Sequence, residues 1–335
     1  MKKAIAAFLL VAIIAISLVG AYYWWNTNST PPSSSSETKT ILIKKGTSAD
    51  AIAQILYEEG VIKSPLAFKV YVQFTGNSQS VQAGEYELPM DQNIQVVTAR
   101  LLKGPSEIWV TVPEGFRREQ IAHRFANSFG LVGESFNAFV IDFMAASEGE
   151  EGFLFPDTYL FPKTASAEKV VAVMSDTFGR KITPDIQAGI ESSPYTQNQL
   201  ITMASILERE TKTDVERPMV AGILWKRLEN EWPLQVDASV QYGVASVNCA
   251  PTNVNCDWWP ILTIDDIEAP SVYNTYKNPQ LPPFPIASPG LSSIEAAVFP
   301  EESEYWFYIH AQDGTIHYAE TIEGHNANIA KYLGK

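Results

Sequence analysis

The residue best suited to chemistry is Glu210, an acidic side chain at the end of a predicted helix. Three apolar residues precede it at helical spacing and share its face: Met203, Ile206 and Leu207. Partial burial at the end of this apolar stripe would disfavour the carboxylate and raise the pKa of Glu210. A carboxyl group that stays protonated near neutral pH can act as a general acid. The spacing therefore favours Glu210 as a proton donor.

Glu208 is the alternative acid, on a different face of the same helix. It aligns with Ile201, Ala204 and Ser205. Both glutamates could instead be ordinary solvated charges at a helix end, which is the usual situation for this residue type. Helical spacing alone therefore does not establish an enzyme.

The elements around Glu210 can be predicted from local signals. Residues 196–199 have the form of a capping box and open the helix that ends at Glu210. A second helix is expected from Thr213 to about Glu231, with its proline tolerated only in the first turn. The chain is then rich in loops until two strands, 305–310 and 315–319, which an Asp-Gly turn joins into a hairpin.

The N-terminal half contains a small mixed unit and an aromatic run. Over residues 39–104, strand signals at 40–43 and 84–88 alternate with helical patterns, one of them capped by Ser48. This mixture predicts an α+β module. Further along, the sequence EGFLFPDTYLFP over residues 151–162 either lines a groove or fills a core.

The N-terminus predicts a membrane anchor. Lys2 and Lys3 precede an uncharged apolar run, Ala4–Ala21, and the aromatic residues Tyr22–Trp25 follow directly. About 20 apolar residues suffice to span a bilayer, and the aromatic residues suit its interface. The two lysines favour a cytoplasmic N-terminus, which leaves the rest of the chain outside. The alternative is a cleaved signal peptide.

Net charge and cysteine content narrow the possible functions. The 335-residue chain has a formal net charge of −14 and a pI of about 4.8. Because nucleic-acid binding needs a basic surface, this balance argues against a nucleic-acid partner. Cys249 and Cys256 have no His or Cys partners at zinc-like spacing, so no metal site is expected. The pair either forms a local disulfide in an oxidising compartment or remains as free thiols.

Several segments, in order along the chain, resemble the endolytic murein transglycosylase family, the YceG-like proteins. They read EGFLFPDTY, MASILERET, VERPMVAGILWKRLENEWPLQVDASVQYG, YNTYKNPQLPPFPIASPGLSSIEAA and EGHNANIAKYL. The resemblance covers nearly the whole chain. It implies an α+β fold with a transmembrane anchor (1–25), a LysM-like module (39–104) and a lytic transglycosylase domain (105–335). Between anchor and module, the polar, Ser- and Pro-rich composition of residues 26–38 predicts a flexible tether.

The resemblance also implies an activity. Such enzymes cleave the β-1,4 bond between N-acetylmuramic acid and N-acetylglucosamine without water and leave 1,6-anhydro ends. A single glutamate suffices, because it protonates the leaving oxygen and then deprotonates the C6 hydroxyl. The pair Glu210-Thr211 is similar to the Glu-Ser signature of lysozyme-like transglycosylases, which favours Glu210. No cofactor is expected. The expected partners are peptidoglycan strands and a glycan polymerase or transpeptidase, and cleavage would terminate strand elongation.

Five matched positions are expected to line the substrate groove, because amides, hydroxyls and rings suit acetamido groups and sugar faces. They are Gln235, Asp237, Tyr242, Asn274 and Tyr276. The alternative is that Asp237 caps a helix and Tyr242 packs in the core. At the level of function, the alternatives are a non-catalytic, membrane-anchored peptidoglycan-binding scaffold and a hydrolase that cuts the same bond with water.

Overall fold

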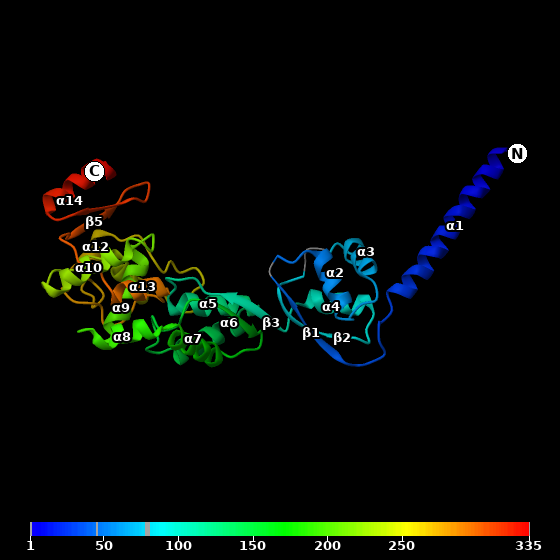
Figure 1. Ribbon diagram of the computed structural model, residues 1–335, viewed down its shortest axis with the longest axis horizontal. Helices are drawn as coiled ribbons and strands as arrows, with labels where there is room; N and C mark the ends of the chain where they lie inside the picture. The colour runs from blue at the N-terminus through cyan, green and yellow to red at the C-terminus, as the bar shows by residue number, and fades with distance from the viewer. Residues whose placement is uncertain (1, 45, 78–80, 335) are drawn as a thin grey trace. The chain divides into compact units, whose positions relative to one another are not determined.

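The computed structural model describes residues 2–44, 46–77 and 81–334. The chain divides into two compact units. The first comprises the residues up to Trp109 together with Leu160–Lys163, and the second comprises Val110–Tyr159 and the residues from Thr164 onward. Helices and strands occur in both units (Figure 1), which confirms the predicted α+β class.

The first helix, α1, spans Lys2–Asn28. Its stretch Leu9–Asn28 has 20 residues and a mean hydropathy of 1.6, and its apolar window is not buried by the rest of the chain. That is long and apolar enough to cross a bilayer, although a signal sequence near the N-terminus has the same properties. The helix continues past Trp25 and includes the first residues of the predicted tether.

A small α+β module follows α1 in the first unit. Strand β1 (Thr38–Ile43) pairs antiparallel with β2 (Gly84–Pro89). Because side chains alternate along a strand, Ile41 and Ile43 point into the core whereas Leu42 is exposed. Three helices complete this core: α2 (Ala49–Glu58), α3 (Pro65–Phe74) and α4 (Ile94–Lys103).

Capping side chains set where two of the predicted helices begin. Ser48 Oγ accepts a hydrogen bond from the Ala51 backbone N–H over 3.2 Å and caps α2. At the start of α9 (Gln197–Glu210), Thr196 Oγ1 accepts from Gln199 N–H, while Gln199 Oε1 accepts from Thr196 N–H. This reciprocal pair confirms the predicted capping box.

The aromatic run that starts at Glu151 fills the core. Leu154 and Phe155 are buried. Gly152 has a φ of +85°, and a Cβ added there would come within 2.5 Å of Pro285. Of the two interpretations of this run, core packing is therefore the one that the structure supports. The run leads into β4 (Thr158–Pro162), which follows β3 (Glu107–Thr111) in a sheet of strand order β1-β2-β3-β4.

The second unit is mainly helical. Its remaining elements, in chain order, are α5 (Arg118–Ser128), α6 (Glu134–Ala146), α7 (Ala167–Lys181), α8 (Pro184–Ser192), α10 (Arg217–Glu229), α11 (Asp237–Asn248), α12 (Ile264–Glu268), α13 (Leu291–Val298), β5 (Phe307–His310), β6 (Ile316–Ala319) and α14 (Ile322–Leu333). The hairpin β5–β6 is antiparallel and confirms the predicted strand pair.

Helix α9 is the central element of this unit. It packs against α10, α11 and α13, and Figure 1 labels α10 and α13 beside it. Every residue from Leu200 to Leu207 is buried. The sequence predicted an apolar stripe on one face, but α9 is surrounded by protein on all sides along these two turns. Beyond Leu207, the C-terminal residues Glu208 to Glu210 are partly or fully exposed.

Candidate active site

Glu210 is the last residue of α9 and opens into a pocket of about 440 Å³. The hydroxyl of Tyr308, on β5, donates a hydrogen bond to Glu210 Oε2 over 3.1 Å. The pocket takes its lining from α9, α10, the segment around the start of α11, the loop between α12 and α13, β5 and α14: Glu210, Arg227, Gln235, Asp237, Tyr276, Phe307, Tyr308, Ile309, Ile322 and His325.

The surroundings of Glu210 favour its protonated form. Burial raises the pKa of Glu210 from its ordinary value of 4.5 to about 7, and the negative charge of Asp237 adds to this rise. The hydrogen bond from Tyr308 and the positive charge of Arg209 act in the opposite direction on this pKa. A carboxyl group with a pKa near 7 is present in both protonation states at neutral pH, as an acid that later acts as a base requires.

Glu208 has a different environment, although it lies only two residues away. Its side chain is 8% exposed and forms an ion pair with Arg217 over 3.4 Å. Its other oxygen accepts hydrogen bonds from Gly290 N–H at 2.9 Å and Ser293 Oγ at 2.8 Å, at the start of α13. These contacts attach α9 to its neighbours, and the carboxyl of Glu208 does not line the pocket of Glu210.

Asp237 and Tyr276 meet on the wall of the pocket. The Tyr276 hydroxyl donates a hydrogen bond to Asp237 Oδ1 over 2.6 Å. Asp237 is exposed as the first helical residue of α11, and the N-cap position of that helix belongs to Val236. Of the roles considered for Asp237, the structure therefore supports a place in the pocket over helix capping.

Gln235 lines the same pocket from an unusual backbone conformation. Its φ is +55°, in the left-handed region that residues with a Cβ rarely adopt. The conformation is held by Thr275, whose carbonyl accepts from Gln235 N–H at 3.1 Å and whose hydroxyl accepts from Val236 N–H at 3.0 Å. Such strain costs about 1–3 kcal/mol and is found mainly where a precise geometry matters for function.

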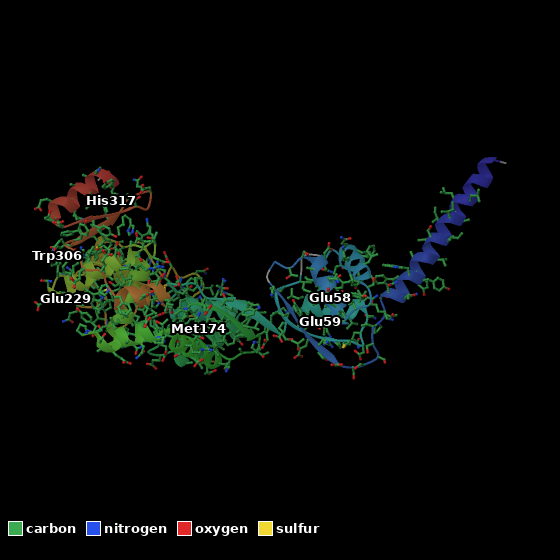
Figure 2. All side chains as sticks on the ribbon, in the orientation of Figure 1. Glu58, Glu59, Met174, Glu229, Trp306 and His317 are labelled. Carbon is green, nitrogen blue, oxygen red and sulfur yellow. A yellow bond between two sulfur atoms is a disulfide. The ribbon has the colours of Figure 1, made fainter. Side chains whose placement is uncertain are left out.

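Arg227 holds the strand of Tyr308 against α10. Its side chain is buried and donates hydrogen bonds to the Trp306 carbonyl, at 2.6 and 2.9 Å, and to the Leu234 carbonyl at 2.8 Å. Figure 2 labels Trp306, which directly precedes β5, and Glu229, the last residue of α10. Through these bonds one guanidinium group fixes both the strand that carries Tyr308 and the segment that leads to Gln235.

Tyr242 and Asn274 lie elsewhere. Tyr242 is 7% exposed, donates a hydrogen bond to Glu151 Oε2 over 3.1 Å, and packs its ring 3.9 Å from the guanidinium carbon of Arg117. Asn274 is fully buried, and its Nδ2 donates to the carbonyls of Ile267 and Ala269 at 2.8 Å each. Neither residue lines the pocket, so the expected groove contacts from these two positions have no support in the geometry.

The cysteines form a disulfide between Cys249 and Cys256, with Cα atoms 5.9 Å apart. The closed loop is attached to α5 by a hydrogen bond of 2.6 Å between His123 Nε2 and the Pro251 carbonyl. Just after the loop, Trp259 packs its ring 3.9 Å from the guanidinium carbon of Arg209. Of the two alternatives for this pair, the disulfide is the one observed.

Comparison with known proteins identifies the family to which the chain belongs. The model of the YceG-like family matches residues 41–331. The chain belongs to this family. It is 30% identical over 320 residues to a Bacillus subtilis protein named endolytic murein transglycosylase, an alignment that covers 88% of this chain and 85% of that protein. The resemblance inferred from the sequence segments is thereby confirmed.

Two further relatives extend this comparison. A Streptococcus pneumoniae protein, also named endolytic murein transglycosylase, is 27% identical over 329 residues, and the alignment spans 88% of this chain but 58% of the longer relative. The crystal structure of a YceG-like protein from Listeria monocytogenes matches with 28% identity and a TM-score of 0.56, over 88% of this chain and 99% of that one.

Three polar residues of this YceG-like pocket, Tyr308, Arg227 and His325, were not predicted from the sequence. Tyr308 lies on a correctly predicted strand, but nothing local indicates that it meets Glu210, 98 positions away. Arg227 lies within the segment that carries the resemblance. Its charge, on a helix that packs into the core, could have indicated a functional role. His325 comes from the segment EGHNANIAKYL, which was matched as a whole without a role for any residue.

Proposed function

We propose that this chain is a peptidoglycan lytic transglycosylase that cleaves the β-1,4 bond between N-acetylmuramic acid and N-acetylglucosamine within glycan strands. One observation carries the proposal: the pocket contains Glu210, whose pKa of about 7 suits an acid that becomes a base. The relatives named endolytic murein transglycosylase support the substrate and the endolytic cut.

The reaction needs one carboxyl group in two roles. Protonated Glu210 first gives its proton to the bridging oxygen, and the N-acetylglucosamine side departs with a new hydroxyl group. Positive charge then develops at C1 of the muramic acid residue. The carboxylate of Glu210 next takes the proton of the C6 hydroxyl, whose oxygen attacks C1 and closes the 1,6-anhydro ring. Glu210 ends protonated as it began. The reaction therefore consumes no water and needs no second catalytic carboxylate.

The neighbours of Glu210 orient its carboxyl group, influence its protonation and contact the substrate. Tyr308 orients the carboxyl group and stabilises it as an anion for the second step, since its hydroxyl donates to Oε2. Asp237, oriented by Tyr276, keeps Glu210 protonated before the first step and can stabilise positive charge at C1. The exposed amide of Gln235 suits the acetamido groups of the substrate.

We further propose that α1 anchors the enzyme in the cell membrane with the pocket on the outer side. The lysines that precede the apolar stretch and the aromatic residues Tyr22–Trp25 after it support this orientation. The resemblance to the family also supports the proposal that the module over residues 39–104 is LysM-like. A partnership with a glycan polymerase or transpeptidase would let cleavage terminate strand elongation, and longer glycan strands on deletion of the protein would support that role.

An analysis of glycan ends tests the proposed reaction. Purified peptidoglycan strands are digested with the wild-type chain and with Glu210→Gln, which keeps the shape of the side chain but lacks the transferable proton. The wild type should produce internal cuts that end in 1,6-anhydro-N-acetylmuramic acid, and the variant should produce none. Free reducing ends would identify a hydrolase, and uncut strands with the wild type would identify a binding scaffold.

A further inference from the structure

Helix α3 carries a stripe of large apolar side chains that no part of its own unit covers. Leu66, Val70 and Phe74 are 57%, 43% and 91% exposed. Residues spaced by four lie on one side of a helix, so the three form a continuous line, called here the α3 stripe. The opposite side of α3 enters the core through Phe68 and Val72. A contiguous apolar line of this kind indicates contact with another surface.

The end of α1 is attached directly beside this helix. The ring of Trp25, on the last turns of α1, stacks on the ring of Tyr71 of α3 with centroids 5.9 Å apart. Ser29, the residue after α1, is buried, and its carbonyl accepts a hydrogen bond from Ile94 N–H over 3.1 Å. The apolar helix therefore continues into the module without a flexible segment between Trp25 and these contacts.

These contacts determine the depth of the α3 stripe relative to a bilayer that α1 crosses. Tryptophan and tyrosine at the end of a transmembrane helix lie at the level of the lipid headgroups. Trp25 is such a residue, and it contacts Tyr71. Phe74 follows Tyr71 by three positions, so the two are neighbours on the surface of α3. The end of the α3 stripe at Phe74 therefore lies beside Tyr71, which contacts a side chain at headgroup level.

We propose that the α3 stripe lies in the headgroup region of the same bilayer that α1 spans, as a second membrane contact of the chain. Lys63, just before α3, supports this position, because its Nζ lies 3.0 Å from Thr30 Oγ1 beside the end of α1. A cation next to an interfacial apolar stripe attracts anionic headgroups. The inference rests on the proposed anchor and goes beyond it, since it gives the module a fixed orientation against the membrane.

Depth-dependent quenching tests the contact in the full chain. Because Cys249 and Cys256 are joined, the variant Phe74→Cys offers one free thiol for an environment-sensitive fluorophore. The labelled protein is reconstituted in vesicles of zwitterionic and anionic phospholipid, with or without lipids that carry a quencher near the headgroup. The matched control is Leu42→Cys, an exposed leucine at 42% on the side of β1 that points away from the core.

The fluorophore at position 74 should shift to shorter wavelength and lose intensity with the quencher lipids, whereas the fluorophore at position 42 should do neither. Flotation of the vesicles separates the two hypotheses. A chain that does not float with the vesicles would refute the anchor and the second contact together. A chain that floats, but whose position 74 is quenched no more than position 42, would refute the second contact alone. A blue shift at position 74 without lipid quenching would indicate a protein partner, such as a second copy, and would also refute it.

Discussion

Replacing Tyr308 with phenylalanine removes the hydroxyl that donates to Glu210 Oε2 over 3.1 Å and leaves the ring in place. That hydrogen bond favours the ionised carboxylate, so it lowers the pKa of Glu210 against the stronger effect of burial. Without it, the folded enzyme should hold the proton of Glu210 to higher pH.

The size of the shift follows from the strength of such bonds. Hydrogen bonds to charged groups contribute about 1.5–3 kcal/mol, and one pKa unit corresponds to about 1.4 kcal/mol. Because Glu210 keeps partial contact with solvent, the lower end of this range applies. The pKa of Glu210 should therefore rise from about 7 to about 8 in Tyr308→Phe.

The pH dependence of kcat/KM for the release of anhydro ends measures this shift. Cleavage begins with protonated Glu210, so kcat/KM falls as the pH rises through its pKa. In Tyr308→Phe this alkaline limb should move upward by about one pH unit, with a lower maximum because the carboxylate of the second step is less stabilised. Asp237→Asn removes a like charge and should move the limb downward instead.

Tyr305→Phe is the matched control, because Tyr305 precedes the same strand and its ring stacks on Tyr318, 5.2 Å away. It should leave the pH profile unchanged. If the limb of Tyr308→Phe stayed in place or moved to lower pH, the hydrogen bond to Glu210 would not act as described. If Tyr308→Phe and Asp237→Asn shifted the limb in the same direction, the electrostatic account of this pocket would be wrong.

Three further outcomes are expected. Because the folded-state pKa of Glu210 is raised from 4.5 to about 7, the folded chain loses stability as the pH rises through that window. Glu210→Gln should therefore raise the free energy of unfolding at pH 8 by up to about 3 kcal/mol, and by much less at pH 4, as denaturant titrations at the two pH values can show. Glu208→Gln weakens the ion pair with Arg217 and should lower stability by about 3 kcal/mol, while activity per folded molecule stays near that of the wild type. Loss of activity without loss of stability would instead make Glu208 the acid. A reporter that works only outside the cytoplasm should be active when fused after Lys335, and activity of a cytoplasmic reporter there would reverse the proposed topology.

Local signals in the chain predicted several elements closely. The capping box at Thr196 placed the start of α9, and the Asp313-Gly314 turn placed the β5–β6 hairpin. Capping and turn formation depend on residues only a few positions apart, so they can be read without the fold. The uncharged apolar stretch of α1 and the α+β class follow from patterns of the same short range.

The choice between neighbouring candidates depends on the tertiary structure. Periodicity put Glu208 and Glu210 on different faces of one helix, but α9 is buried on every side before both of them. Contacts with distant segments distinguish the two glutamates. Arg217 and the start of α13 bind Glu208, whereas the Tyr308 hydroxyl binds Glu210. Such contacts join residues far apart in the chain, and no spacing rule encodes them.

The segments that carry the family resemblance also separate what the sequence determines from what the tertiary structure decides. The sequence by itself determined the family, the helix that ends at Glu210 and the polar residues near the start of α11. Only the tertiary structure decided that Gln235, Asp237 and Tyr276 share the pocket, while Tyr242 and Asn274 are buried in the framework. The physical reason is that a polar side chain suits a groove and a buried hydrogen-bond network equally well, and only the packing of distant elements decides which of the two surrounds it.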